Sequence, residues 1–152
     1  MRWKPHVTVA AVVERNGRFL LVEEEADGRV VYNQPAGHLE AGEGLVEAVV
    51  RETREETGWD VRPDAVVGIH QWTSPAGKTF LRVSFACTAL GRDPARVPDA
   101  GIREVLWLTR EEIVARAGAV RSPLVFRCLD DYLAGRRYPL ELLVRLAAEP
   151  DS

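Results

Sequence analysis

The sequence predicts an α+β domain in which a mixed β-sheet is layered with helices. Apolar, β-branched segments come first, a long helix-forming segment interrupts them, and further strands and then helical segments follow. The 152 residues, 46% of them hydrophobic and 28% charged, have the size and composition of one globular domain. We therefore expect residues 1–152 to form a single domain, with residues 138–152 as a candidate extension packed on it.

The segments before the central helix predict a hairpin and a short third strand. Asn16-Gly17 favours a type I′ turn, so the segments on its two sides should pair as neighbouring strands. Asp27-Gly28 marks a second turn. The three strands expected here are residues 6–14, 18–24 and 29–33.

The central helix is predicted by an uninterrupted run of good helix formers from Leu45 to Glu56, which Gly58 closes. At about 100° per residue, the run has two distinct sides. The side expected to pack on the core carries Val46, Val50, Thr53 and Thr57. The other side carries Glu52, Glu55 and Glu56.

The second half of the chain predicts further strands and then helices. A hairpin turn is expected around residues 74–77, and residues 91–101 contain two prolines and no periodicity, which indicates a loop. Thr109 to Glu112 is a capping box, and Ser122-Pro123 is typical of a helix start. The expected elements are strands over 65–72, 79–90 and 104–108, helices over 109–117 and 122–135, and a tail over 138–148 that could be helical or extended.

Composition excludes several classes of protein. The net charge is −3 and the basic residues are scattered, which makes a nucleic acid an unlikely main partner but leaves a small phosphorylated ligand open. Cys87 and Cys128 have no metal-site spacing, so we expect free, buried thiols in a reducing compartment, the cytoplasm. The apolar run at residues 7–13 is too short to cross a membrane.

Three carboxylates on one side of a helix have two interpretations. Taken alone, Glu52, Glu55 and Glu56 would be a solvated face that weakens the helix through like-charge repulsion. A divalent cation such as Mg²⁺ or Mn²⁺ reverses that effect, because it prefers hard oxygen ligands.

The residues around these glutamates favour the metal. Gly37, Glu43, Arg51-Glu52, Glu55-Glu56 and Gly58 stand in an order and spacing that resembles the box defining the Nudix hydrolases. The position after Glu52 departs from that pattern, because a larger aliphatic residue is usual there and this chain has Thr53. Segments outside the box also resemble one branch of the family, the NudJ phosphatases. They are residues 4–10, 33–40, 70–72, 121–125 and 137–141.

The resemblance implies an α/β/α sandwich with a mixed sheet and a central catalytic loop and helix. It also implies hydrolysis of a nucleoside diphosphate linked to another group, with Mg²⁺ as the cofactor and Mn²⁺ as a substitute. In the family pattern the metal ligands would be the carbonyl of Gly37 and the carboxylates of Glu52, Glu55 and Glu56. The catalytic residues would be Glu52, Glu55 and Arg51, the last orienting carboxylates by bidentate pairing.

The general base is left open between two sets of acids. One is Glu52 or Glu55 in the box, and the other is Asp99 or Glu104, in or just after the long loop. The three histidines, His6, His38 and His70, could serve as a base or as structural hydrogen-bonding groups.

Substrate selection should come from outside the box. The candidate substrate-binding residues are Arg82, Lys78 and Gln34, where Arg82 or Lys78 could hold a terminal phosphate. Arg82 could equally be a solvated charge on an edge strand. Trp72, Tyr32 and Phe80 could stack on a planar ring or belong to the core.

We therefore expect a metal-dependent hydrolase of small organic di- and triphosphates, and resemblance suggests a monomer. The NudJ branch implies attack on the terminal phosphorus, releasing inorganic phosphate from nucleoside di- and triphosphates and thiamin pyrophosphates. The alternatives are cleavage of an internal anhydride, as for ADP-ribose, a non-catalytic nucleotide-binding module, and an RNA 5′-end pyrophosphohydrolase.

Overall fold

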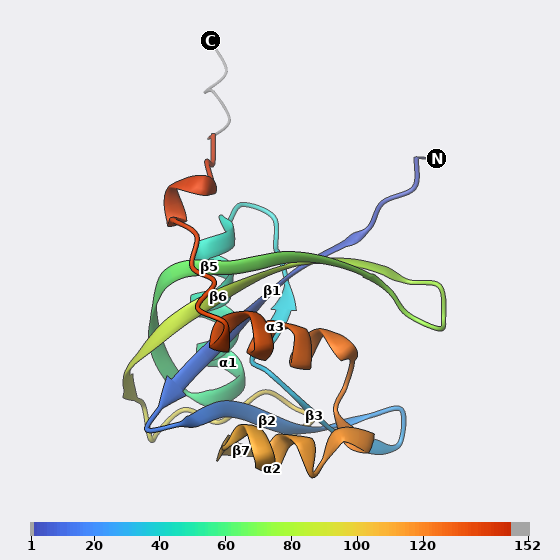
Figure 1. Ribbon diagram of the computed structural model, residues 1–152, viewed down its shortest axis with the longest axis vertical. Helices are drawn as coiled ribbons and strands as arrows, with labels where there is room; N and C mark the ends of the chain where they lie inside the picture. Colours follow the sequence, from blue (N-terminus) through green and yellow to red (C-terminus); the bar gives the residue numbers. More distant parts are fainter. Residues whose placement is uncertain (1, 147–152) are drawn as a thin grey trace.

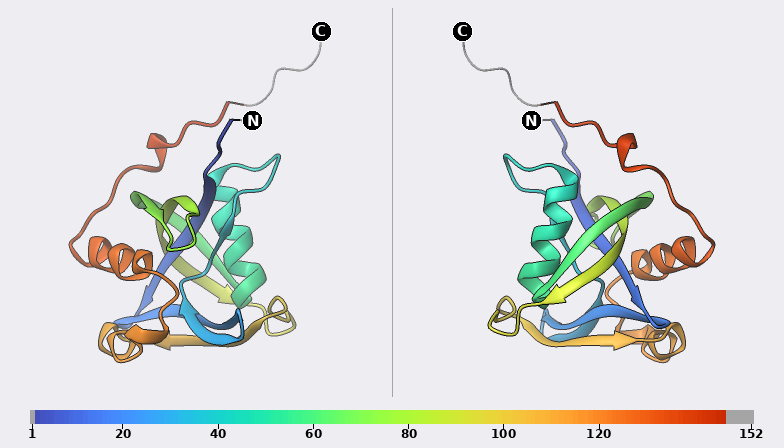
Figure 2. Two further views of the ribbon diagram at one scale, coloured as in Figure 1. Left: turned by 90° about the vertical axis from the view of Figure 1, so that its right-hand side faces the viewer. Right: turned by 90° about the vertical axis from the view of Figure 1, so that its left-hand side faces the viewer.

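A mixed β-sheet with helices on both faces forms the protein, and the computed structural model describes residues 2–146 (Figure 1). Helices α1 and α3 lie on opposite sides of the sheet (Figure 2). The strands are β1 (His6–Arg15), β2 (Arg18–Ala26), β3 (Arg29–Asn33), β4 (Ala36–His38), β5 (Trp59–Thr73), β6 (Thr79–Arg92) and β7 (Ile102–Leu108). The helices are α1 (Leu45–Thr57), α2 (Arg110–Val114) and α3 (Pro123–Leu133), with short 3-10 helices at Ala117–Ala119 and Leu140–Leu142.

The strand order explains how distant segments meet. It runs β3-β2-β1-β6-β5, with β4 also paired to β1 and β7 to β2. The β1–β6 pair is parallel, with His6 opposite Phe80 and Val13 opposite Cys87, whereas the other pairs are antiparallel. The sheet is therefore mixed, as expected, and β6 is an interior strand between β1 and β5.

Side chains of β1 alternate between two cores, because successive residues of a strand point to opposite faces. Val9, Ala11 and Val13 belong to the core beneath α1, and Val12 belongs to the core beneath α3. The central strands are thus apolar on both faces, which is typical of a sheet covered by helices on both sides.

Local signals placed most boundaries correctly. Asn16 and Gly17 both have positive φ, 54° and 77°, as a type I′ turn requires. Gly58 ends α1 in the left-handed conformation at φ 77°. Ser122 Oγ accepts a hydrogen bond of 3.2 Å from the Leu124 backbone N–H, confirming the predicted start of α3.

The larger differences from the prediction concern one strand that was not expected, the start of β5 and the end of α2. β4 was not expected, because three residues without an apolar pattern become a strand only by pairing with β1. β5 begins at Trp59 instead of residue 65, since it pairs with β6 along its whole length. The capping box of α2 is present, but the helix ends at Val114, before the expected residue 117.

The tail after α3 contains no α-helix in residues 138–146 and is extended apart from the short 3-10 helix at Leu140–Leu142, which mostly favours the extended alternative. Tyr138 and Val66 exchange two backbone hydrogen bonds of 2.8 Å, which attach the tail to β5. Farther on, Arg145 donates to the Gly42 carbonyl at 2.9 Å and to Glu47 at 3.1 Å. The tail thus reaches the loop before α1, and its last predicted residues, 147 and 148, lie outside the described range. Within residues 2–146, no helix is long and apolar enough to cross a membrane.

Candidate active site

Helix α1 is held on the sheet by a face slightly different from the predicted one. Its buried residues are Ala48, Val49, Thr53 and Thr57, whereas Val46 and Val50 are only partly buried. Thr53 is 0% exposed, and its hydroxyl donates to the Val49 carbonyl at 2.7 Å. The unusual threonine is therefore accommodated, because its polar atom is satisfied within the helix.

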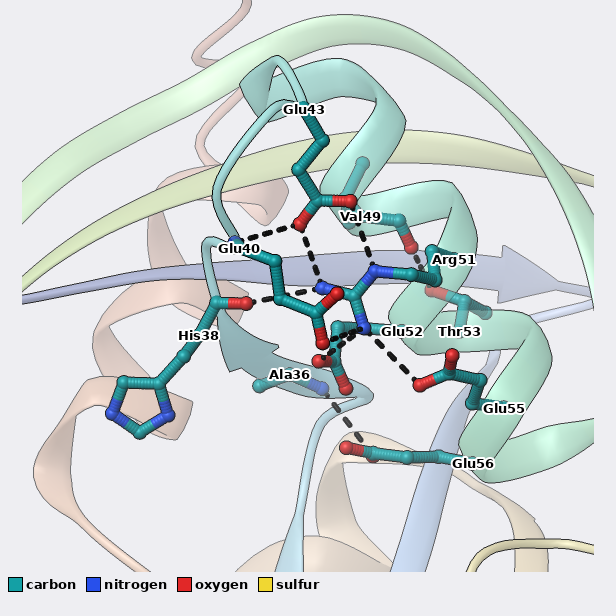
Figure 3. A network of polar contacts seen from close by, with 10 residues as sticks. All are labelled: Ala36, His38, Glu40, Glu43, Val49, Arg51, Glu52, Thr53, Glu55 and Glu56. Carbon is teal, nitrogen blue, oxygen red and sulfur yellow. Dashed lines mark hydrogen bonds and ion pairs between the residues drawn. The ribbon is translucent and has the colours of Figure 1, made fainter.

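Arg51 is the centre of the polar network on the other face of α1 (Figure 3). Its guanidinium donates two hydrogen bonds to Glu43, at 2.7 and 2.9 Å, in the bidentate geometry that fits a carboxylate. It also donates to Glu52 at 2.8 Å, to Glu55 at 3.1 Å and to the His38 carbonyl at 3.1 Å. One side chain thus connects the loop before α1 to two of the three helix glutamates.

The segment from Ala36 to His38 lies directly against these glutamates. A Cβ atom added at Gly37 would overlap the Glu52 carboxylate, so only glycine allows the backbone and the carboxylate to approach this closely. The Ala36 backbone N–H donates to Glu56 at 3.4 Å. β4 therefore brings the Gly37 backbone beside Glu52, and its Ala36 N–H to Glu56.

Burial sets the charge state of the helix acids. It raises the pKa of Glu56 to about 9, with further contributions from the negative charges of Glu52 and Glu24. Burial also raises the pKa of Glu52, although the hydrogen bond and charge of Arg51 oppose this shift. The Arg51 hydrogen bonds lower the pKa of Glu43. In the metal-free protein, burial therefore favours the protonated form of Glu56 at neutral pH, whereas Arg51 keeps Glu43 ionised.

The chemistry of these donors fits a hard divalent cation. Carboxylate and carbonyl oxygens are the ligands that such ions prefer, and Glu52, Glu56 and Gly37 bring them together in one place. No ready-made group of three acidic, histidine or cysteine ligands exists in residues 2–146. Glu52 and Glu55 instead bind Arg51, so a metal would compete with this guanidinium for their oxygens.

A pocket of about 430 Å³ is lined in part by all three residues of β4. Of the predicted site residues, Gly37, Lys78 and Arg82 line it, whereas Glu52, Glu55 and Glu56 do not. Trp72 and Phe80 also line the pocket and stack with ring centroids 5.9 Å apart. The pocket thus combines a border at the acid cluster with cations and an aromatic wall.

Two predicted substrate-binding residues are deeply buried. Arg82 is 7% exposed on the interior strand β6, so its interpretation as a solvated edge charge is wrong. Gln34 is 1% exposed and does not line the pocket. Its side-chain oxygen accepts a 3.4 Å hydrogen bond from Arg82, so it supports a residue of the pocket without lining the pocket itself.

The two acids outside the box lie in different places. The Asp99 backbone N–H donates to the Glu55 carbonyl at 3.1 Å, which holds the long loop against the end of α1. Glu104 of β7 lies opposite Glu23 of β2 in the strand register, and it lines a separate cavity together with Trp59 and Trp107. Asp99 is thus attached to the catalytic helix, and Glu104 faces another part of the surface.

The remaining predicted side chains have structural partners. Both cysteines are free and buried, as expected. His70 pairs with Asp131 of α3 at 2.8 Å, and Tyr32 donates to Glu23 at 2.8 Å outside the pocket. Seven polar residues of the pocket lining were not among the predicted site residues: Thr8, Glu24, Asp27, Asn33, Ser74, Arg121 and Ser122.

Comparisons with known proteins agree with this geometry. The family model described as NUDIX domain matches residues 4–128. "Phosphatase NudJ" of Escherichia coli (strain K12) is 47% identical over 141 residues, which are 93% of this chain and 92% of the relative, and that of Shigella sonnei (strain Ss046) gives the same values. A solved structure of a NUDIX hydrolase from Nitrosomonas europaea superposes with a TM-score of 0.92 at 46% identity, covering 94% of this chain and 98% of the other.

These matches extend well beyond the residues of the box. They cover 93% and 94% of this chain, whereas the residues of the box lie between residues 37 and 58. The family model alone spans more than half of the chain. The protein therefore belongs to the Nudix hydrolase family, enzymes that hydrolyse phosphoanhydride bonds.

Proposed function

We propose that the protein is a Mg²⁺-dependent phosphatase that removes the terminal phosphate from small organic di- and triphosphates. The observation that carries this proposal is the packing of the α1 carboxylates against Gly37 at the border of a pocket that contains Arg82 and Lys78. The relatives named Phosphatase NudJ support release of inorganic phosphate. Nucleoside di- and triphosphates and thiamin pyrophosphates are the proposed substrates.

Each residue of the acid cluster has a proposed role. The carboxylates of Glu52, Glu55 and Glu56 and the carbonyl of Gly37 would hold the metal. Mg²⁺, or Mn²⁺ in its place, would neutralise phosphoryl oxygens and make the attacking water more acidic. Arg51 orients the carboxylates of Glu52 and Glu55 through its hydrogen bonds.

The proton of the attacking water needs an acceptor, and a box glutamate is the favoured one. Glu52 and Glu55 lie in the cluster itself, whereas Glu104 lines a different cavity. Asp99 is the remaining alternative, because its loop contacts the end of α1. If Asp99 is the base, Asp99→Asn should lower kcat by about 10² or more; if a box glutamate is the base, it should change kcat little.

The metal role is tested by replacing single carboxylates. Glu55→Gln and Glu56→Gln should each lower kcat by about 10² or more while the fold is retained. Glu47→Gln is the matched control, because Glu47 lies on the same helix but is exposed, and its one ion-pair partner in residues 2–146 is Arg145. Near-normal turnover of both variants would reject the catalytic assignment of these carboxylates. A wild type that releases no phosphate would instead indicate a non-catalytic binding module.

The position of attack is tested with labelled water. The enzyme is incubated with GTP, GDP, thiamin diphosphate and ADP-ribose under Mg²⁺ in ¹⁸O-water. Label in free orthophosphate from the first three supports terminal attack. Formation of GMP and pyrophosphate from GTP, or preferential cleavage of ADP-ribose, would instead identify an enzyme that cuts an internal anhydride.

The remaining parts of the proposal concern the setting of the enzyme. A cytoplasmic location is supported by two free, buried cysteines, which need no oxidising compartment. The proposed partner is the small phosphorylated substrate alone, with the protein acting as a monomer.

A further inference from the structure

Three buried polar atoms in the described residues 2–146 have no hydrogen-bond partner, and all belong to residues that line one pocket. They are Thr8 Oγ1, Asn33 Oδ1 and Arg82 Nε. Buried polar groups in native proteins are nearly always paired, so unpaired atoms concentrated at one place need an explanation. Their shared location indicates that this pocket is completed by a polar ligand.

Of the three residues, Arg82 restricts the nature of that ligand most, because its side chain carries a positive charge. It is 7% exposed, its one hydrogen bond to an oxygen atom in the described part of the chain is the 3.4 Å contact with Gln34, and the Cys128 thiol is the other polar side chain that favours its charge most. No carboxylate in residues 2–146 lies within ion-pair distance of it, whereas Arg51 has four such partners. A water molecule could satisfy its N–H groups but would not neutralise it. A buried cation without a counter-charge calls for an anion.

The register of the strands places Arg82 beside the acid cluster. Thr8 of β1 lies opposite His38 of β4 on one side and opposite Arg82 of β6 on the other. Gly37, the next residue of β4, borders the Glu52 carboxylate. Arg82 is therefore two strands away from the segment where the metal ligands meet.

An aromatic row lies next along the same strands. His6, Phe80 and Trp72 are opposite one another on β1, β6 and β5, and their ring centroids are 5.3 and 5.9 Å apart. These residues lie two positions along the strands from Thr8 and Arg82, so they face the same side of the sheet. The pocket thus presents an acid cluster at its border, a buried cation on its floor and an aromatic surface beside it.

We propose that Arg82, supported by Gln34, is an anion site that binds the phosphate on the leaving-group side of the scissile bond. This inference rests on the proposed terminal attack. Water adds to the terminal phosphorus, one of its protons passes to the base, and the bridging P–O bond breaks with its electron pair left on the bridging oxygen. Arg82 stabilises the negative charge that develops on this oxygen, so substrates with at least two phosphates are selected. A planar ring of the substrate lies on Phe80 and Trp72.

The test of this site measures anion binding without turnover. Inorganic pyrophosphate, in EDTA and without metal, should raise the melting temperature of the wild type, and Arg82→Met should abolish that response. Arg62→Met is the matched control, because Arg62 is an exposed arginine of the same sheet that is already paired with Asp64. Arg62→Met should respond as the wild type does. A wild type that does not respond, or an equal response of Arg82→Met, would overturn the proposal.

Kinetics test the role of the same residue in turnover. Arg82→Met should lower kcat/KM about 10- to 100-fold for GDP and thiamin diphosphate alike, with part of the loss in kcat. If kcat/KM fell for only one of the two substrates, Arg82 would contact the ring of that substrate, and the phosphate assignment would be rejected. If Arg82→Met does not fold, Arg82→Lys takes its place, because lysine keeps the charge but lacks the planar guanidinium with its paired N–H donors. Arg82→Lys should lose part of the pyrophosphate-induced rise in melting temperature and part of kcat/KM. The pyrophosphate result does not depend on which phosphorus is attacked, so this site and the proposed function can fail separately.

Discussion

Glu56→Gln should stabilise the metal-free protein, by an amount that grows with pH. Burial and neighbouring negative charges raise the pKa of Glu56 to about 9, from 4.5 for an unperturbed glutamate. Between these values the folded protein holds a proton that the unfolded chain has lost, so the wild type becomes less stable as the pH rises. A glutamine keeps the shape of the protonated acid and removes this dependence.

The size of the effect follows from the interval between the two pKa values. One pKa unit corresponds to about 1.4 kcal/mol. Keeping Glu56 protonated in the folded state therefore lowers the unfolding free energy by at most about 3 kcal/mol at pH 7 and about 6 kcal/mol at pH 9. Near pH 4.5 the cost disappears. The gain in unfolding free energy from Glu56→Gln should therefore rise from about zero at pH 4.5 to about 3 kcal/mol at pH 7.

Urea unfolding in EDTA at pH 5, 7 and 8.5 measures this gain. Glu55→Gln is the comparison, because its carboxylate is more exposed and paired with Arg51, and its effect should be smaller. Mg²⁺ should reverse the order of stability, since the wild type would bind the ion more tightly than Glu56→Gln. A gain that does not change with pH, or a loss of stability at pH 8.5 in EDTA, would refute the reasoning.

Three further outcomes follow from the same site and from the tail. Gly37→Ala should lower kcat by about 10² or more, because the new Cβ overlaps the Glu52 carboxylate. Steady-state kinetics measure this loss, and circular dichroism shows whether the fold is retained. Arg51→Lys should lower unfolding free energy by about 1–3 kcal/mol, since an ammonium group cannot reproduce the bidentate contact with Glu43; urea unfolding with no measurable change would contradict this. Light scattering should give a monomer mass with and without residues 138–152, and a larger particle in either case would reject the monomer.

Signals that act over a few residues were sufficient for much of the structure. The turn at Asn16-Gly17 and the stop at Gly58 depend only on local backbone preferences, and both were confirmed. The contact between Arg51 and Glu55 likewise follows from their i, i+4 spacing on one helix. Such features can be predicted because their cause is contained in the segment itself.

Features that depend on strand order could not be predicted in this way. β4 becomes a strand because it pairs with β1, and Arg82 is buried because β6 lies between β1 and β5. The pocket combines residues from several strands with the loop before α3, so no single spacing contains it. The packing face of α1 was placed one residue away from the buried Val49, because a helix pattern shows periodicity but not the exact direction of its neighbour.

The parallel pairing of β1 with β6 also has a consequence for folding kinetics. This pair joins the start of the chain to residues that follow the whole catalytic segment, so Gly37 and α1 lie inside the loop that the pairing closes. Closing a long loop is entropically costly and slow, and local contacts within α1 do not remove that cost. During refolding, α1 can form early, but the approach of Gly37 to Glu52 requires β4 to be seated on β1. Recovery of enzymatic activity should therefore coincide with the slowest, chain-wide step and lag behind the return of helical signal.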